Sequence, residues 1–245
     1  MPIYGTLALE QYAGTAPVTG ELAFEEWETD QAEALTLNYE VEDTYRLEML
    51  PAALHPAIPL YAQITVRKHE SSPVGAFNLA EVRLMTRAGS HYGGYTIGAF
   101  ANTQESVEFL RSRYGWAASL GDVTLNQRHF GAHAHVELDG RCVLEMSLKH
   151  PQPITPADLL VTAGFHLAQV GSDLRLIQSE PSYEIEMIQR GEPKLTTLDS
   201  EAFGDARVQA RNPIVATYLK GSFKLGRVRY LIDPTRPATE GTERI

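Results

Sequence analysis

The chain has 245 residues, 43% of them hydrophobic, and carries 21 Lys and Arg against 31 Asp and Glu, a formal net charge of −10. This length suits one large domain with a sizeable core. Residues 1–60 hold eleven of the acids and one base, so the remaining 185 residues are electrically neutral. An acidic segment repels phosphate groups, and we therefore expect no nucleic-acid partner.

The composition also limits the compartment and the cofactors. No apolar run approaches the roughly 20 residues of a membrane span, and residues 1–4 lack the basic and apolar parts of a signal peptide. The single cysteine, Cys142, excludes an internal disulfide framework and a cysteine-based zinc site. We expect a cytoplasmic protein with no membrane partner and no cofactor.

Alternation of apolar and polar residues predicts most of the secondary structure. Strands are expected at 60–66, 77–85, 95–101, 214–219 and 228–232. Two hairpins complete this set. One lies within 131–146 and turns at Asp139-Gly140, a pair that favours a two-residue turn, and the other turns at 171–173.

One helix is expected, because Asn102 can cap a helix start with Glu105 three positions later. Val107, Leu110 and Tyr114 follow at helical spacing. A shorter turn is expected where proline follows Thr155. Many strands and few helices predict an α+β fold that is mostly antiparallel β, with a curved or closed sheet and a few helices at its edge.

A histidine-rich strand is the first candidate site. His133, His135 and Glu137 share one face of the predicted strand, with His129 close by, and two imidazoles with a carboxylate can hold a divalent metal. Cupin-type barrels use a similar His-x-His element, although their other spacings are not found here. The simpler interpretation is a polar or pocket-facing strand of an ordinary hairpin, so we predict no metal site.

Two other residue types bear on catalysis. Glu81 interrupts an apolar strand, and on that segment alone a surface position is the default interpretation. A lysine needs burial or a neighbouring cation before its amine is nucleophilic at neutral pH. None of the five lysines lies beside another or in a strongly apolar run.

Three stretches resemble the acetoacetate decarboxylase-like superfamily. Residues 39–51 are similar to its entry segment, 106–121 to its active-site helix and loop, and 214–231 to its closing strands. The resemblance implies a β-rich fold around a small pocket, and covers residues 39–232. Within 106–121, the family pattern is matched by Arg111, Gly115, Trp116 and Gly121.

The departures from the family pattern concern its chemistry. Ser112 stands where the family has glutamate, and Ala117 where it has proline. Ala118 and Ser119 occupy its two lysine positions. Alanine has no amine, so the Schiff base that serves these decarboxylases as electron sink cannot form at position 118.

The resemblance therefore predicts an enzyme that reuses the pocket without Schiff-base chemistry, for acid–base dehydration, cyclisation or isomerisation of a keto-containing small molecule of secondary-metabolite type. It implies Glu81 as acid or base and Arg111 as the group that binds a carboxylate or enolate. The expected substrate-binding residues are Gln63, Trp116, Ala118, Ser119, His133 and His135.

Two alternatives remain open from the sequence: a non-catalytic small-molecule binding protein on the same fold, and a His-x-His metal protein of cupin-like type. The expected organisation is a single domain of residues 1–245. It comprises an acidic N-terminal addition (1–38), a core (39–232) and a polar tail (233–245). Members of the superfamily commonly form homo-oligomers, which we expect here.

Overall fold

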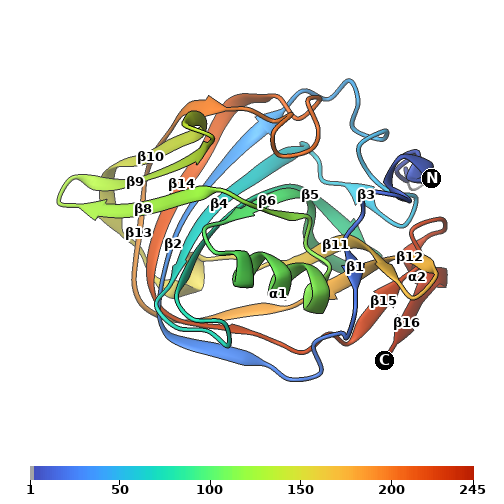
Figure 1. Ribbon diagram of the computed structural model, residues 1–245. Coiled ribbons are helices and arrows are strands. Elements are labelled where there is room, and N and C mark those ends of the chain that lie inside the picture. Colours follow the sequence, from blue (N-terminus) through green and yellow to red (C-terminus); the bar gives the residue numbers. More distant parts are fainter. Residues whose placement is uncertain (1–2) are drawn as a thin grey trace.

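The computed structural model describes residues 3–245 (Figure 1). Sixteen strands form one sheet, whose main path runs β16-β15-β12-β11-β6-β5-β4-β2-β14-β13-β10-β9-β8. Among the strands of residues 3–245, only the pairs β1–β11, β6–β11 and β6–β7 are parallel. The strands are β1 (Val18–Thr19), β2 (Trp27–Val41), β3 (His55–Pro56), β4 (Tyr61–His69), β5 (Phe77–Ala88), β6 (His91–Ala101), β7 (Ala118–Leu120), β8 (Asp122–Arg128), β9 (Gly131–Leu138), β10 (Arg141–Pro153), β11 (Ala163–Val170), β12 (Asp173–Ser179), β13 (Pro181–Leu198), β14 (Ala210–Leu225), β15 (Tyr230–Ile232) and β16 (Thr242–Arg244).

The helices are few and short, which confirms the predicted class of a mostly antiparallel α+β fold. They are α1 (Gln104–Tyr114) and α2 (Ala238–Gly241), with 3₁₀ turns at Leu9–Tyr12 and Pro156–Asp158. The second 3₁₀ turn stands where the Thr155-Pro156 pair predicted one. No helix in the described part of the chain has the length and apolar character needed to span a bilayer.

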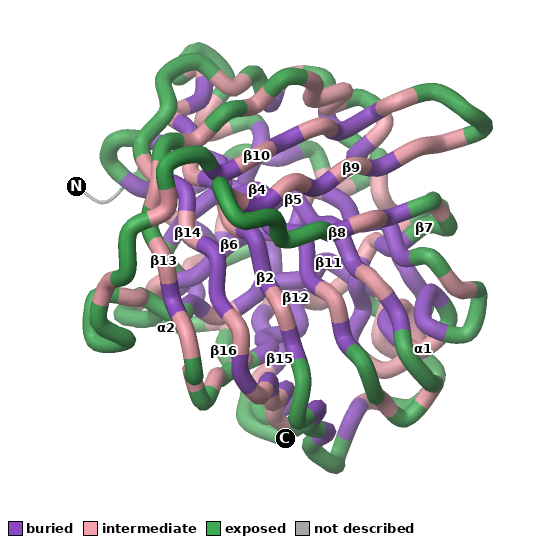
Figure 2. Tube along the Cα trace, turned by 90° about the vertical axis from the view of Figure 1, so that its left-hand side faces the viewer, coloured by how far each residue is buried: buried purple, intermediate pink, exposed green. Residues whose placement is uncertain are grey.

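Strands β4 and β5 lie in the middle of the sheet and are buried on both faces, whereas β2 beside them is buried on one face and mostly half-buried or exposed on the other (Figure 2). Successive side chains of a strand point to opposite faces, so each strand supplies two cores. Leu35, Ile64 and Val82 belong to the larger core, which β8, β9 and β10 complete. Phe77 and Leu79 belong to a second core on the other face, where α1 packs.

Helix α1 confirms the predicted helix, and Val107, Leu110 and Tyr114 are buried, as expected, together with Ser106. The predicted cap is wrong by one residue. The Thr103 hydroxyl accepts from the backbone N–H of Ser106. Asn102 is not available as a cap, because its side-chain oxygen accepts the backbone N–H of Asn78 and so joins the helix start to β5.

Both predicted hairpins are confirmed. Strands β9 and β10 are joined by Asp139 and Gly140, whose φ angles of 50° and 76° are those of the expected two-residue turn. Strands β11 and β12 pair across residues 171–172. The β8–β9 hairpin extends away from the body of the molecule (Figure 1).

The predicted boundary at residue 39 falls inside β2 and marks no structural division. Strand β2 pairs with β4 and β14, and thus lies within the sheet. Its acidic side chains fit there because lysines of β14 neutralise several of them: Lys220 lies 3.4 Å from Glu33 and Lys224 lies 3.5 Å from Glu28. The expected polar tail likewise contributes α2 and the edge strand β16.

Candidate functional site

Strand register brings polar side chains from separate segments onto one buried face. Thr36 of β2 lies opposite Thr65 of β4, which lies opposite Glu81 of β5. The neighbouring row joins Asn38, Gln63 and Arg83 in the same way. Directly paired residues point to the same side of a sheet, so these side chains are neighbours.

A cavity of about 160 Å³ lies against this face. Strands β2, β4, β5, β13 and β14 and the segment 158–162 line it. The lining residues are Ala34, Thr36, Asn38, Tyr61, Gln63, Thr65, Arg67, Arg83, Asp158, Leu159, Leu160, Val161, Thr162, Pro181, Tyr183, Arg190, Val215, Thr217 and Leu219. One side of the cavity is therefore cationic and hydroxylated, whereas segment 158–162 contributes mainly apolar side chains.

Three buried ionised side chains form the centre of the polar face. Nη2 of Arg67 lies 2.6 Å from Oε1 of Glu81, and Nε of Arg83 lies 3.4 Å from the same oxygen. Arg83 also donates through Nη2 to the Gln63 side-chain oxygen. Arg67 is 4% exposed, Arg83 5% and Glu81 0%. Two cations share one anion, so the cluster carries a net positive charge away from water.

Glu81 remains a carboxylate in this environment. Burial alone would raise its pKa, but the Arg67 and Arg83 guanidiniums hold the pKa of Glu81 below its ordinary value. Burial lowers the pKa of Arg83 from that of an exposed arginine. For Arg67, burial acts in the same direction, yet Glu81 and Tyr183 hold the pKa above its ordinary value.

Several buried polar atoms of this face lack a hydrogen-bond partner. Among lining residues they are Nη1 of Arg67, Nε of Arg83, Oδ1 of Asn38 and Oγ1 of Thr162, and beside them Oε2 of Glu81. A buried polar group without a partner costs roughly 1–3 kcal/mol, and more when it is charged. Native interiors seldom leave such groups without partners, so these atoms are open to hydrogen bonds from a polar ligand or from water.

Phenols and one carboxylate supply proton-transfer groups at the cavity. The Tyr183 hydroxyl accepts a hydrogen bond from Nε of Arg67 at 2.9 Å, which leaves its own proton for another acceptor. Tyr61 is hydrogen-bonded to the Tyr92 hydroxyl. Asp158 is the carboxylate among the lining residues described, at the cavity rim, while Glu81 lies behind the arginines.

The structure places two residues predicted from sequence, Gln63 and Glu81, in this cluster. The default surface position for Glu81 is wrong, because both faces of β5 are covered. The row containing Thr65 and Glu81 continues through Ala99 of β6 to Ala118 of β7. A position matched to the family's lysine thus lies on the face and in the row of Glu81, two strands away.

Arg111 and Ser119 lie elsewhere, at a second cavity of about 250 Å³ beside β6. Nη1 of Arg111 donates to the Ala118 carbonyl at 3.1 Å, which ties the end of α1 to β7. Trp116 packs in the core, with its ring 4.9 Å from that of His166. None of Arg111, Ser119 and Trp116 is among the lining residues of the first cavity.

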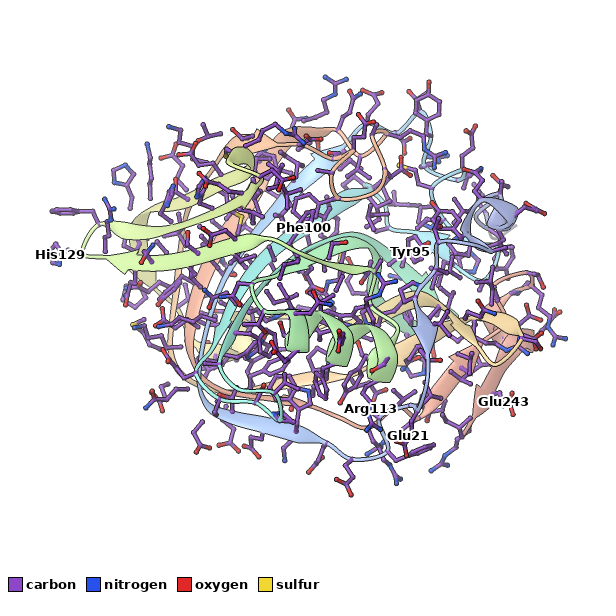
Figure 3. All side chains as sticks on the ribbon, viewed as in Figure 1. Glu21, Tyr95, Phe100, Arg113, His129 and Glu243 are labelled. Atoms are coloured by element: carbon purple, nitrogen blue, oxygen red, sulfur yellow. The ribbon has the colours of Figure 1, made fainter. Side chains whose placement is uncertain are left out.

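His133 and His135 are half-buried on β9, with the neighbouring Ala132 and Ala134 turned into the core, as the alternation predicted. Nε2 of His133 lies 3.4 Å from Glu145, and Nε2 of His135 lies 3.3 Å from Glu137. His129 lies at the outer tip of the hairpin (Figure 3). Within residues 3–245, no three His, Cys, Asp or Glu side chains are grouped to hold a metal.

The lysines lie away from the cavity. Within the described chain, none of Lys68, Lys149, Lys194, Lys220 and Lys224 is buried, and none is a lining residue. Lys68 pairs with Glu70 at 2.5 Å on the surface. No lysine amine is therefore positioned beside the buried arginines.

Sequence reasoning did not single out Arg67, Arg83 or Tyr183. A signal was present in β4, where Gln63, Thr65 and Arg67 alternate with apolar residues. On a strand covered on one side only, that pattern is an ordinary solvent face. In the folded chain, β13 and the 158–162 segment also cover this face, so the polar side chains of β4 line a cavity.

Comparison with known proteins gives a match in structure but none in sequence: no protein-family model and no curated protein matches the chain. An acetoacetate decarboxylase from Legionella pneumophila superposes with a TM-score of 0.75 at 13% identity, covering 87% of this chain and 88% of that one. The chain has the acetoacetate decarboxylase-like fold.

Two further neighbours share the acetoacetate decarboxylase-like fold. An acetoacetate decarboxylase-like enzyme from Sphingomonas wittichii has a TM-score of 0.64 at 17% identity, over 83% of this chain and 92% of that one. The enduracididine biosynthesis enzyme MppR, complexed with pyruvate, has a TM-score of 0.68 at 15% identity, over 86% and 97%. The neighbours of this fold are thus enzymes with differing activities, a decarboxylase and a biosynthetic enzyme among them.

Proposed function

We propose that the protein is an enzyme that binds a small keto-containing carboxylate in the 160 Å³ cavity and acts on it by acid–base chemistry, without a covalent lysine intermediate. The observation that carries this proposal is the pair of buried arginines with unpartnered atoms at the cavity. An anionic ligand would neutralise their excess charge and satisfy their free N–H groups.

The arginines suit a reaction through an enolate. Arg83 and Gln63 bind the substrate carboxylate, while Arg67 and the Tyr183 hydroxyl stabilise negative charge that develops on the ketone oxygen. Dehydration, cyclisation and isomerisation of keto compounds can all proceed through such an enolate, so these donors support the whole reaction class.

We assign proton removal from the carbon beside the ketone to Asp158, because it is the acidic residue among the described residues that line the cavity. Glu81 is a positioning residue in this scheme, since it holds both guanidiniums from behind. Arg111 binds no substrate in the scheme and instead ties α1 to β7.

The structural neighbours are consistent with a keto-acid ligand. MppR has been captured with pyruvate and with the condensation product of pyruvate and imidazole 4-carboxaldehyde. Those ligands belong to MppR, but they are consistent with a pocket of this fold that holds a small 2-oxo acid or a condensation product of one.

Solvent deuterium exchange tests the proposed chemistry. In deuterated buffer, the protein should accelerate loss of the pyruvate methyl signal in proton NMR, because each enolisation exchanges a proton with solvent. Asp158→Asn should slow this exchange about 100-fold, a typical contribution of a general base. Glu137→Gln, on the remote hairpin, is the matched control and should exchange at the wild-type rate.

The same experiment separates catalysis from simple binding. If pyruvate binds but the protein leaves the exchange rate at that of buffer, the non-catalytic binding function is correct. If exchange is fast in wild type and equally fast in Asp158→Asn, the assignment of the base is wrong.

A further inference from the structure

The cavity is amphipathic, and its apolar side lies in the segment between the 3₁₀ turn and β11. Leu159 packs against an apolar cluster that includes Ile188 and Leu219. The next two residues do not: Leu160 is 65% exposed and Val161 is 38% exposed. Both nevertheless line the cavity that holds the buried arginines.

The segment is held at both ends, so these exposed side chains are presented in a defined place. The backbone N–H of Ile154 donates to the Ile188 carbonyl, and that of Leu159 donates to Pro156. Thr162 is buried and leads into β11. Leu160 and Val161 thus form the exposed middle of an otherwise anchored rim.

The charged residues at the cavity rim balance each other, so they do not favour a ligand with a second charged group. Asp158 and Arg190 both line the cavity, carry opposite charges and are exposed. The buried cluster of Arg67, Arg83 and Glu81 supplies one net positive charge. A ligand with a single negative charge at one end and an apolar chain at the other matches this arrangement.

We propose that the substrate is a 2-oxo acid with a hydrocarbon tail, whose carboxylate meets Arg83, whose ketone oxygen meets Arg67 and whose tail covers Leu160 and Val161. This inference rests on the proposed function and adds the substrate class. Tail burial on Leu160 and Val161 removes apolar surface from water, which is favourable in proportion to the area covered.

Calorimetric titration with straight-chain 2-oxo acids, from pyruvate to 2-oxohexanoate, tests the inference. Each added methylene should tighten binding about fourfold, the value expected for burial of one CH₂ group. The double variant Leu160→Ser/Val161→Ser should lose most of the gain in affinity along the series. Phe130→Ser is the control, because Phe130 is 82% exposed on the remote hairpin.

Three results would overturn the tail site. Equal dissociation constants for all four acids would show that no tail is buried. A chain-length gain that persists in Leu160→Ser/Val161→Ser would place the tail elsewhere. A lower molecular mass of that variant in light scattering would assign Leu160 and Val161 to a contact between copies of the chain.

The experiment also separates this inference from the proposed function. If pyruvate binds in a manner that depends on Arg83 while chain length has no effect, the proposed function stands and only the tail site is wrong. If none of the four acids binds, both fail.

Discussion

One face of the central sheet contains two regions, one packed with apolar side chains and the other with polar and charged ones. Around α1, Phe77, Leu79, Ala99 and Ala118 pack in an apolar core. A few residues away on the same strands, the face is polar and includes Arg83 with its partners beside the cavity. The same strands therefore carry a closed apolar core in one half and a polar surface beside the cavity in the other.

Glu81 lies at the boundary between these halves, with Thr65 on one side and Ala99 on the other. In the apolar half, small side chains at 99 and 118 leave no ionisable partner in the Glu81 row. In the polar half, two arginines compete for one carboxylate. The buried cations are therefore confined to the polar half, and Ala118 is part of the apolar core.

Removal of the shared anion should have the largest effect on stability. Glu81→Leu leaves the buried Arg67 and Arg83 charges without a counter-ion, which should lower the free energy of unfolding by about 3–5 kcal/mol. Urea denaturation measures this change. A loss below about 1 kcal/mol would show that the arginines find other compensation.

Conversion of the polar cluster into an apolar one separates its effect on stability from its effect on pyruvate binding. The triple variant Arg67→Met/Glu81→Leu/Arg83→Met should recover most of the stability lost in Glu81→Leu, because apolar residues of similar volume replace buried ion pairs at little cost. It should bind no pyruvate. Recovery of stability together with full binding would contradict the role given to the arginines.

His69, in the apolar half, should contribute to the loss of folding stability at low pH. The His69 ring lies 4.9 Å from those of Phe77 and Phe223, and burial lowers the pKa of His69 to about 3. The unfolded chain binds a proton near pH 6.5, so the stability contributed by neutral His69 is complete above that pH. It should fall by up to about 1.4 kcal/mol per pH unit as the pH drops toward 3.

The matched variant for this slope is His69→Phe, which cannot take up the proton. Urea unfolding between pH 7 and pH 5 should show a smaller loss for the variant than for wild type. Some slope should persist, because burial also places the pKa of His166 well below its ordinary value. Identical slopes in the two proteins would show that His69 is solvated or charged in the fold.

The smallest expected effect is an absence of covalent labelling. Borohydride added with acetoacetate should leave the protein mass unchanged, since within residues 3–245 no lysine lines the cavity. A Schiff-base acetoacetate decarboxylase treated in parallel is the positive control. An adduct on Lys68 or any other lysine would require a covalent mechanism.

Local sequence patterns were sufficient for much of the fold. The alternating run at 60–66, the Asp139-Gly140 turn and the helical spacing in α1 each depend on residues close in the chain. Strands β2 and β13 were missed, because charged residues recur along β13 and in the first half of β2 and resemble those of a solvated segment. Their place in the sheet depends on pairing with β14, which no local pattern encodes.

The candidate site was only partly predictable for the same reason. Gln63 and Glu81 could be found through the family resemblance or an odd polar residue in an apolar strand. Arg67 and Arg83 could not be found in this way. Cross-strand register places them beside Glu81, and the distant segment 158–162 completes the cavity that they line. For Arg111 the family resemblance implied substrate binding, whereas in the structure its guanidinium donates to the Ala118 carbonyl.

The most direct test of the account is calorimetric titration of pyruvate into wild type, Arg83→Met and the surface control Arg113→Gln, whose arginine pairs with Glu21 at 2.7 Å (Figure 3). One binding site is expected in wild type and in the control. Binding to Arg83→Met should be at least tenfold weaker, since a hydrogen bond to a charged group contributes about 1.5–3 kcal/mol. Equal affinity in wild type and Arg83→Met, or no binding to wild type, would contradict it.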